Sequence, residues 1–248
     1  MKILGNIGLF SFVAVSFFGL GDYKRRIDKA AKDGNKEEER KAIYEAEKYW
    51  SNKIKDYLNL EINVINPENL PKDGPAVYVA NHQSYGDVIP FLNVLNHAVG
   101  FIGKDSLEKI PVFSDWVLRI RSLFIKRGDA RTSLGTINEG ANMVKDGYSL
   151  VIFPEGTRNK AGEELLPFKE GSFKMAEKTG CLVIPVALSN TAEIFENHLP
   201  WIKPQKVVVE YGTPIDPKTL SREEMKHLGA TCRDRIQEML DKNAELIK

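Results

Sequence analysis

A histidine and an aspartate lie five residues apart, directly behind an apolar run that is typical of a buried strand. The stretch NHQSYGD at residues 81–87 begins where the run AVYVA at residues 76–80 ends. A carboxylate that bonds to one imidazole nitrogen fixes the tautomer and leaves the other nitrogen to act as a general base. His82 and Asp87 are therefore candidates for a base and the residue that orients it.

The spacing decides how these two side chains can meet. Five positions of an ideal α-helix span roughly 500° of rotation, about 140° away from alignment, so the two side chains would not share a helical face. They can meet only across a turn, and Asn81 and Gly86 are residue types that tolerate the backbone geometry of a turn. We also expect the peptide N–H groups that follow residue 82 to stabilise an oxyanion.

Two members of a hydrolase triad would then be present, but a nucleophile is not evident. The sequence has no G-x-S-x-G pattern. A histidine–aspartate pair without its own nucleophile can deprotonate a hydroxyl group of a substrate. The alternative is that the nearby hydroxyl of Ser84 is a covalent nucleophile.

The stretch FPEGTRN at residues 153–159 follows another apolar run and has the chemistry of an anion site. Arg158 offers a planar fork of donors that suits a phosphate, and Gly156 allows the backbone to approach a ligand closely. Glu155 can steer that arginine or accept hydrogen bonds from substrate hydroxyls, but an Arg–Glu pair can also simply pin a loop. Further cations that could complete an anion pocket, or could be ordinary solvated surface residues, are Lys104, Lys126 and Arg127.

The elements that must position these residues alternate between apolar runs and amphipathic stretches. Alternation of this kind predicts an α/β fold in which a mostly parallel or mixed sheet is flanked by helices. Ligand-binding residues of such sheets gather at the carboxyl ends of the strands, so we expect the two polar stretches to converge. The expected strands are 62–66, 76–80, 98–102, 123–127, 149–153, 182–188 and 206–212, and the expected helices include residues 113–120, 134–144 and 173–176.

The first 20 residues include an uncharged apolar segment at residues 3–20, which is marginal in length for crossing a bilayer. It is compatible with a signal peptide, a membrane-spanning anchor or a helix embedded in one leaflet. The basic residues at 24–26 outnumber Lys2, so the positive-inside rule places the rest of the chain on the cytoplasmic face of the cytoplasmic membrane.

A charged helix with one apolar stripe is expected at residues 43–58, after a break at Gly34 and Asn35. This helix either packs on the following domain or forms an antiparallel pair with the apolar segment at the membrane surface, and both can hold together. We therefore predict a membrane-associated helical segment at residues 1–60 and a catalytic domain at residues 61–248.

Composition excludes several classes of protein. The 35 basic and 34 acidic residues leave almost no net charge, which argues against a nucleic-acid-binding protein. Cys181 and Cys232 lie in no C-x-x-C pattern, and the other histidines, His97, His198 and His227, have no ligand-like spacing. We therefore predict neither a disulfide framework nor a metal site.

Five stretches in this order and spacing resemble the motif series of the glycerolipid acyltransferases, and most of all the 1-acyl-glycerol-3-phosphate acyltransferases of the bacterial PlsC type. The resemblance covers roughly residues 60–215, and Asn159 stands where many members carry serine. The five stretches are NHQSYGD, GKDSLEKIP, LFIKRGD, FPEGTRN and VIPVAL.

The resemblance implies transfer of an acyl group from acyl-CoA or acyl-carrier protein to the sn-2 hydroxyl of lysophosphatidic acid, a membrane lipid, without a bound cofactor. His82 would be the base and Asp87 its partner. Glycerol phosphate would bind Glu155, Gly156, Thr157 and Arg158, with help from Lys104, Lys126 and Arg127. The residues expected near the acyl chain are Phe101, Phe113, Trp116 and Pro185, for which packing in the core is the alternative.

Two other functions stay open at this point. The acceptor can be glycerol-3-phosphate or another lysophospholipid, because no single residue distinguishes these acceptors. A protein of another class, a catalytically silent membrane scaffold, would keep the fold but would have no need of the histidine–aspartate pair.

Overall fold

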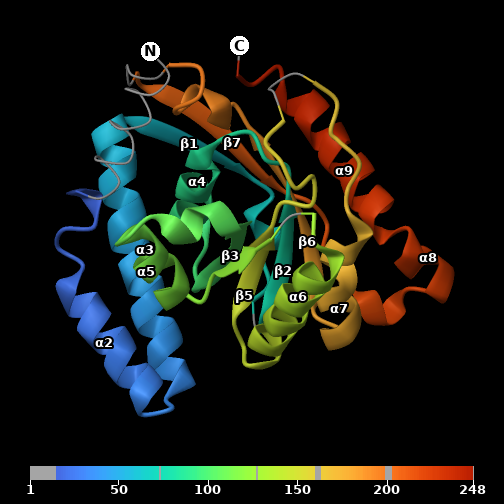
Figure 1. The fold of residues 1–248 in the computed structure, drawn as a ribbon. Helices are drawn as coiled ribbons and strands as arrows, with labels where there is room; N and C mark the ends of the chain where they lie inside the picture. The colour runs from blue at the N-terminus through green and yellow to red at the C-terminus, as the bar shows by residue number, and fades with distance from the viewer. Residues whose placement is uncertain (1–14, 73, 127, 160–162, 199–202, 248) are drawn as a thin grey trace.

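The computed structural model describes residues 15–72, 74–126, 128–159, 163–198 and 203–247. Within these ranges, seven strands form one sheet in the order β1-β7-β6-β2-β5-β3-β4 (Figure 1). The strands are β1 (Leu60–Ile65), β2 (Ala76–Ala80), β3 (Val99–Lys104), β4 (Leu123–Ile125), β5 (Ser149–Ile152), β6 (Leu182–Ser189) and β7 (Gln205–Tyr211).

The pairing of the strands is mostly parallel. Neighbouring strands run parallel except at the pair β6–β7, which is antiparallel. Each of the seven expected apolar runs overlaps one strand, so the predicted α/β fold with a mixed sheet is confirmed. The ends differ by one or two residues; β1, for example, ends at Ile65 because Asn66 adopts a left-handed φ of 55°.

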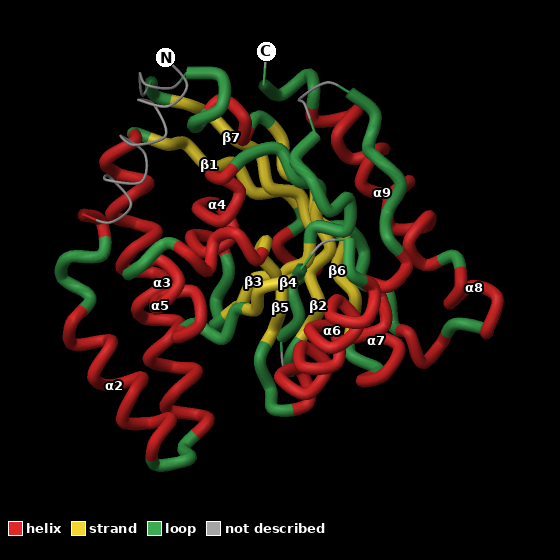
Figure 2. Tube along the Cα trace, viewed as in Figure 1, coloured by secondary structure: helices red, strands yellow, loops and turns green. Residues whose placement is uncertain are grey.

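Helices cover both faces of the sheet (Figure 2). One face packs against α6, α7 and α9 in a core that includes Val79, Ile152 and Met175. The other packs against α4 around Tyr78 and Phe91. Burial on both faces explains why the strands read as continuous apolar runs. The helices of these layers and their neighbours are α4 (Val88–Val94), α5 (Phe113–Arg119), α6 (Ala130–Lys145), α7 (Lys174–Thr179), α8 (Arg222–Lys226) and α9 (Leu228–Asn243).

A helical hairpin, α2 (Gly21–Lys32) and α3 (Lys36–Leu58), precedes the sheet and packs beside it (Figure 1). The predicted break is confirmed: Gly34 has a φ of 69°, and the Asn35 side chain caps α3 by accepting from the N–H of Glu38 at 3.1 Å. The apolar stripe of α3 packs on the sheet domain, where Ile43 shares a buried cluster with Trp116. Within the described residues, the helix that pairs with α3 is therefore α2.

The predicted apolar segment at residues 3–20 falls largely on residues 1–14, which lie outside the described residues. Its last residues are packed: Phe17 stacks on Trp50 and on Trp116 with centroid distances of 5.9 Å, and Ser16 Oγ accepts from Trp50 Nε1 at 2.7 Å. In the part of the chain that the structure describes, no helix combines the length and apolar character needed to cross a bilayer. Membrane attachment and the domain boundary at residue 60 stay predictions.

A buried carboxylate fastens the hairpin to the sheet domain. Glu39 on α3 is only 3% exposed and accepts from Arg121 Nε at 2.6 Å and from Tyr148 Oη at 2.9 Å. Arg121 and Tyr148 precede β4 and β5. These donors replace the water that the carboxylate loses on burial, which makes its burial tolerable. The contact joins Glu39 to segments of the chain that are 82 and 109 residues away.

Replacing Glu39 by alanine should destabilise the protein by about 1–3 kcal/mol, because two donors lose a charged acceptor. Urea unfolding followed by circular dichroism measures the change in the free energy of unfolding. Glu37→Ala is the matched control, since Glu37 lies in the same first turn of α3 but is exposed. Equal losses for the two variants would contradict the anchoring role of Glu39.

Candidate active site

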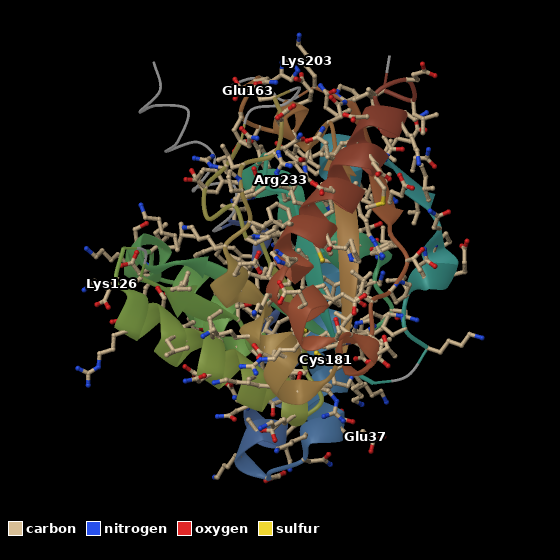
Figure 3. All side chains as sticks on the ribbon, turned by 90° about the vertical axis from the view of Figure 1, so that its right-hand side faces the viewer. Glu37, Lys126, Glu163, Cys181, Lys203 and Arg233 are labelled. Atoms are coloured by element: carbon tan, nitrogen blue, oxygen red, sulfur yellow. The ribbon has the colours of Figure 1, made fainter. Side chains whose placement is uncertain are left out.

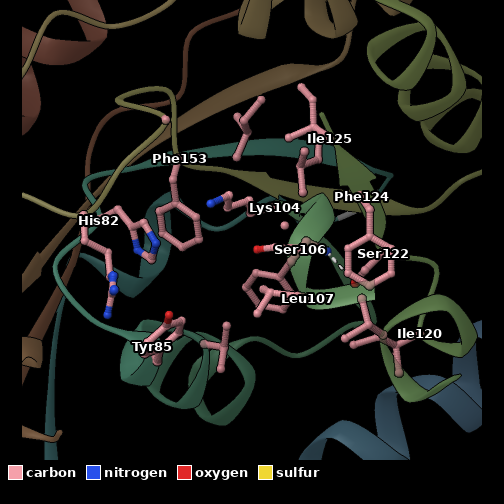
Figure 4. Close-up of a pocket in the computed structure, with 18 of the residues that line it drawn as sticks. His82, Tyr85, Lys104, Ser106, Leu107, Ile120, Ser122, Phe124, Ile125 and Phe153 are labelled. Carbon is pink, nitrogen blue, oxygen red and sulfur yellow. Dashed lines mark hydrogen bonds between the residues drawn. The ribbon is translucent and has the colours of Figure 1, made fainter. Parts of the chain in front are cut away.

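The predicted convergence of polar stretches at one edge of the sheet is confirmed. β6, β2, β5, β3 and β4 are successive parallel neighbours, so their carboxyl ends share an edge. A cavity of about 1040 Å³ opens there (Figure 4). Its lining includes His82, Lys104, Gly156, Thr157 and Arg158.

His82 and Asp87 meet across a turn, as their spacing predicts. His82 Nδ1 lies 2.6 Å from Asp87 Oδ2, and residues Tyr85–Asp87 form a 3₁₀ turn rather than a helix that includes His82. The Asp87 side chain is fully buried, whereas 17% of the His82 side chain is exposed at the cavity. The bond to Nδ1 leaves Nε2 as the ring nitrogen available to a substrate.

Every peptide N–H from residue 82 to residue 86 donates to a side chain of the protein. The N–H of His82 donates to Glu155 Oε1 at 3.0 Å, and those of Gln83 and Ser84 donate to Asp87 Oδ2 at 2.9 and 3.1 Å. The next two N–H groups donate to Glu196 Oε1 and to Ser84 Oγ. The prediction that these N–H groups stabilise an oxyanion is therefore wrong, because each of them already donates to a carboxylate or a hydroxyl of the protein.

The hydroxyl of Ser84 is also engaged. It donates to the Glu196 carboxylate and accepts from the N–H of Gly86 at 2.8 Å. Ser84 is fully buried and caps the turn that holds Asp87. This arrangement does not support Ser84 as a covalent nucleophile, since its proton is bonded to Glu196 and not to His82.

The loop after β5 lies directly against His82. Phe153 stacks on the imidazole with a centroid distance of 4.4 Å, and the two rings lie side by side in Figure 4. Glu155 is buried and accepts from the N–H groups of His82 and Leu166. Burial raises the pKa of Glu155, and these two hydrogen bonds oppose the rise. Glu155 therefore joins two loops and is absent from the described lining of the cavity.

Gly156 and Arg158 lie on the cavity side of the same loop. Gly156 has a φ of 70°, and a Cβ at this position would collide with the Lys169 ammonium group. Arg158 lies over the Tyr85 ring, 3.9 Å from its centroid, and donates to Glu196 Oε1 at 2.6 Å. An arginine and a lysine thus stand at the cavity beside His82.

The remaining predicted residues separate into two groups. Phe101, Phe113 and Trp116 line the cavity. Lys126 is exposed at the periphery of the molecule (Figure 3), and Pro185 lies within β6 opposite Val79. Neither Lys126 nor Pro185 is in the described lining, and Arg127 lies outside the described residues.

Several lining residues have no counterpart in the predictions. Two are cations: Lys169 precedes the 3₁₀ turn Glu170–Phe173, and Lys174 is the first residue of α7. Their only sequence signal is closeness to the FPEGTRN stretch.

Among the described residues, no group of three histidine, cysteine or carboxylate side chains has a metal-binding arrangement. Further apolar lining residues that sequence reasoning missed are Phe124, Ile125, Leu134, Ile137 and Phe195.

The region that matches a known protein family includes the residues of this site. The sequence model of the family described as Acyltransferase matches residues 61–189. The chain belongs to the acyltransferase family. That region contains the His82–Asp87 turn, the loop after β5 and five of the strands at the shared edge.

Relatives and a solved structure agree with this membership. The chain is 33% identical over 192 residues to the 1-acyl-sn-glycerol-3-phosphate acyltransferase of Escherichia coli, covering 77% of this chain and 76% of that protein. It is 31% identical over 182 residues to the protein of the same name from Borreliella burgdorferi, covering 73% and 72%. The crystal structure of the 1-acyl-sn-glycerophosphate acyltransferase PlsC from Thermotoga maritima matches with a TM-score of 0.75 and 26% identity, over 97% of this chain and 95% of that one.

Replacing Asp87 by asparagine should lower kcat by about 10²–10⁴-fold, because an amide cannot hold His82 in the same tautomer or support its positive charge. The fold should persist, since asparagine preserves the size of the side chain. Steady-state transfer kinetics and a circular dichroism spectrum test both statements. Asp216→Asn, which changes the cap of a short helix after β7, is the control. An unchanged kcat in Asp87→Asn would show that Asp87 does not assist His82 in catalysis.

Glu47 is a carboxyl group that α3 buries beside the cavity. Its Oε2 accepts from the N–H of Val99 at 3.2 Å, and its Oε1 has no hydrogen-bond partner within the described part of the chain. Burial raises the pKa of Glu47 well above its ordinary value of 4.5. The folded protein therefore holds a proton that the unfolded chain releases, so the free energy of unfolding falls as pH rises above about 4.5, by at most about 1.4 kcal/mol per unit.

Glu47→Gln removes this proton linkage and should gain stability relative to wild type as pH rises from 5 to 8. Urea unfolding of both proteins at three pH values in this range measures the difference. Glu37→Gln, an exposed change on the same helix, should show a difference that does not vary with pH. A constant difference for Glu47→Gln as well would show that Glu47 does not titrate upon unfolding.

Proposed function

We propose that this protein transfers a fatty acyl group from an acyl thioester to the sn-2 hydroxyl of 1-acyl-glycerol-3-phosphate, which yields phosphatidic acid in phospholipid biosynthesis. The observation that carries the proposal is the His82–Asp87 pair at a large, mostly apolar cavity whose lining includes Arg158, Lys104 and Lys169. The names of the relatives from Escherichia coli and Borreliella burgdorferi support this acceptor.

The chemistry needs a base and no acyl-enzyme. His82 Nε2 takes the proton of the acceptor hydroxyl while the oxygen attacks the thioester carbonyl. The resulting tetrahedral intermediate collapses, the carbon–sulfur bond breaks, and the imidazolium returns the proton to the leaving thiolate. Asp87 supports the positive charge on His82 during this cycle, for which general-base assistance contributes about 10²–10⁴-fold.

We assign the phosphate of the acceptor to the cations of the cavity lining. Arg158 and Lys169 flank Gly156, and Lys104 lies at the end of β3 in the same lining. We assign the developing oxyanion to the two lysines, because the N–H groups of the 82–86 turn are already bonded. Gly156 and Thr157 contribute the surface against which the glycerol lies.

The acyl chains are assigned to the apolar part of the cavity, where Phe101, Phe113 and Trp116 lie. Acyl-CoA and acyl-carrier protein both present a thioester of the required kind. We further propose that the protein works at the cytoplasmic face of the cytoplasmic membrane, because its substrate and product are lipids. The uncharged segment at residues 3–20 and the basic residues behind it support this location.

A labelled acyl thioester offered with three acceptors in parallel tests the function. Wild-type protein in detergent should form phosphatidic acid from lysophosphatidic acid, and His82→Ala should lose at least about 10²-fold of this activity because the base is gone. His227→Ala is the matched control, since His227 is an exposed histidine between α8 and α9. Product is measured by thin-layer chromatography and thiol release.

The other acceptors decide between the alternatives. Preferential transfer to glycerol-3-phosphate or to lysophosphatidylcholine would keep the mechanism and change the substrate. Release of no thiol with any acceptor would favour the membrane scaffold. Comparison of acyl-CoA with acyl-carrier protein as donor in the same assay identifies the thioester.

A further inference from the structure

The segment that follows β6, residues 190–198, lies against the turn that holds the catalytic pair. Thr191–Glu193 form one 3₁₀ turn, and Thr191 is fully buried. Ile194 packs so closely on Gly86 that a Cβ there would lie 3.1 Å from its side chain. All of this segment lies beyond residue 189, where the matched family region ends, so the family comparison assigns it no role.

Glu196 in this segment accepts hydrogen bonds from both loops of the site. Its Oε2 accepts from the hydroxyl of Ser84, and its Oε1 accepts from the N–H of Tyr85 at 2.9 Å. The same Oε1 accepts from an Arg158 guanidinium nitrogen at 2.6 Å. One carboxylate therefore connects the His82–Asp87 turn, which follows β2, to the loop that follows β5.

Arg158 is held in two directions by these neighbours. The Tyr85 ring lies under the plane of the guanidinium group, and Glu196 binds one of its edges. The Arg158 side chain is 37% exposed, and that of Glu196 is 23% exposed. A guanidinium group carries five N–H donors in a rigid plane, so fixing one edge and one face restricts the directions of the remaining donors. Arg158 is also part of the cavity lining.

We propose that Glu196 is a positioning residue that orients Arg158 toward the phosphate of the acceptor and keeps it in register with His82. The inference rests on the proposed function. Without Glu196, the guanidinium group would lose its charged partner and would have to be ordered by the substrate itself. That ordering lowers the affinity for the acceptor and leaves the reaction of the bound thioester unchanged.

Repulsion between Glu196 and the phosphate opposes this effect, since both are anions. A carboxylate that only repelled the phosphate would weaken binding, and its removal would lower the KM of the acceptor. A carboxylate that positions Arg158 strengthens binding, and its removal raises that KM. The sign of the change therefore distinguishes the two roles.

Glu196→Gln keeps the size of the side chain and one acceptor oxygen but removes the charge. We expect the KM for lysophosphatidic acid to rise about tenfold, while kcat and the KM for the thioester change by less than about threefold. Steady-state kinetics with each substrate varied in turn measure these constants. A lowered or unchanged acceptor KM, or an equal loss with every substrate, would overturn the proposal.

Two further variants keep the test decisive if Glu196→Gln is poorly folded. Glu196→Asp keeps the charge and shortens the side chain, so its acceptor KM should lie between those of wild type and Glu196→Gln. Glu193→Gln is the matched control, because Glu193 lies in the same segment but pairs with His198. This control should keep the acceptor KM of wild type, and a similar rise would show that any change in the segment has the same effect.

The Arg158→Ala background tests whether Glu196 acts through Arg158. Adding Glu196→Gln to Arg158→Ala should leave the acceptor KM unchanged, because the residue that Glu196 orients is absent. If the two substitutions instead raise the acceptor KM by independent factors that multiply, the proposal is overturned. The proposed function fails if the wild-type protein transfers no acyl group to any glycerophosphate acceptor. The inference about Glu196 fails separately, if the wild-type protein is active and the Glu196→Gln variant keeps an unaltered acceptor KM.

Discussion

The buried carboxylate of Asp87 is the group on which the rest of the site depends. A fully desolvated carboxylate is costly unless it accepts hydrogen bonds. Asp87 Oδ2 accepts from His82 Nδ1 and from the N–H groups of Gln83 and Ser84, while Oδ1 has no hydrogen-bond partner among the described residues. These donors can converge only if the chain turns sharply after β2. Asn81 fixes where that turn begins, because its side chain bonds to both backbone groups of Leu188 on the neighbouring strand β6.

Three carboxylates then join the loops that the parallel strands deliver to one edge of the sheet. Asp87 closes its own turn, Glu155 joins that turn to the segment near Leu166, and Glu196 joins it to Arg158. Each of these carboxylates accepts from at least one N–H of the turn. His82 and Arg158 are therefore held on one hydrogen-bonded frame, which is the condition that the proposed alignment of a substrate hydroxyl with a thioester requires.

Two different parts of the fold build the cavity. Loops at the carboxyl ends of β2 and β5 supply His82 and Arg158, whereas the helical hairpin supplies Ala46, Trp50 and Ile54 on α3. Glu39 fastens that hairpin to the sheet domain by its bonds to Arg121 and Tyr148. The part of the cavity wall that α3 forms thus depends on the contact of Glu39, which is absent from the described lining of the cavity.

The sequence by itself determined the strands, the turn between His82 and Asp87, and the convergence of their loops, because buried parallel strands are continuous apolar runs and local spacing dictates a turn. Tertiary structure alone decided that Lys126 is exposed, that Glu155 is buried and accepts from the N–H of His82, and that α3 pairs with α2 in the described residues. It also decided that Glu196 binds Ser84, 112 residues away in the chain. Side-chain direction and contacts between distant segments follow from packing of the whole chain, which no local pattern of residue types contains.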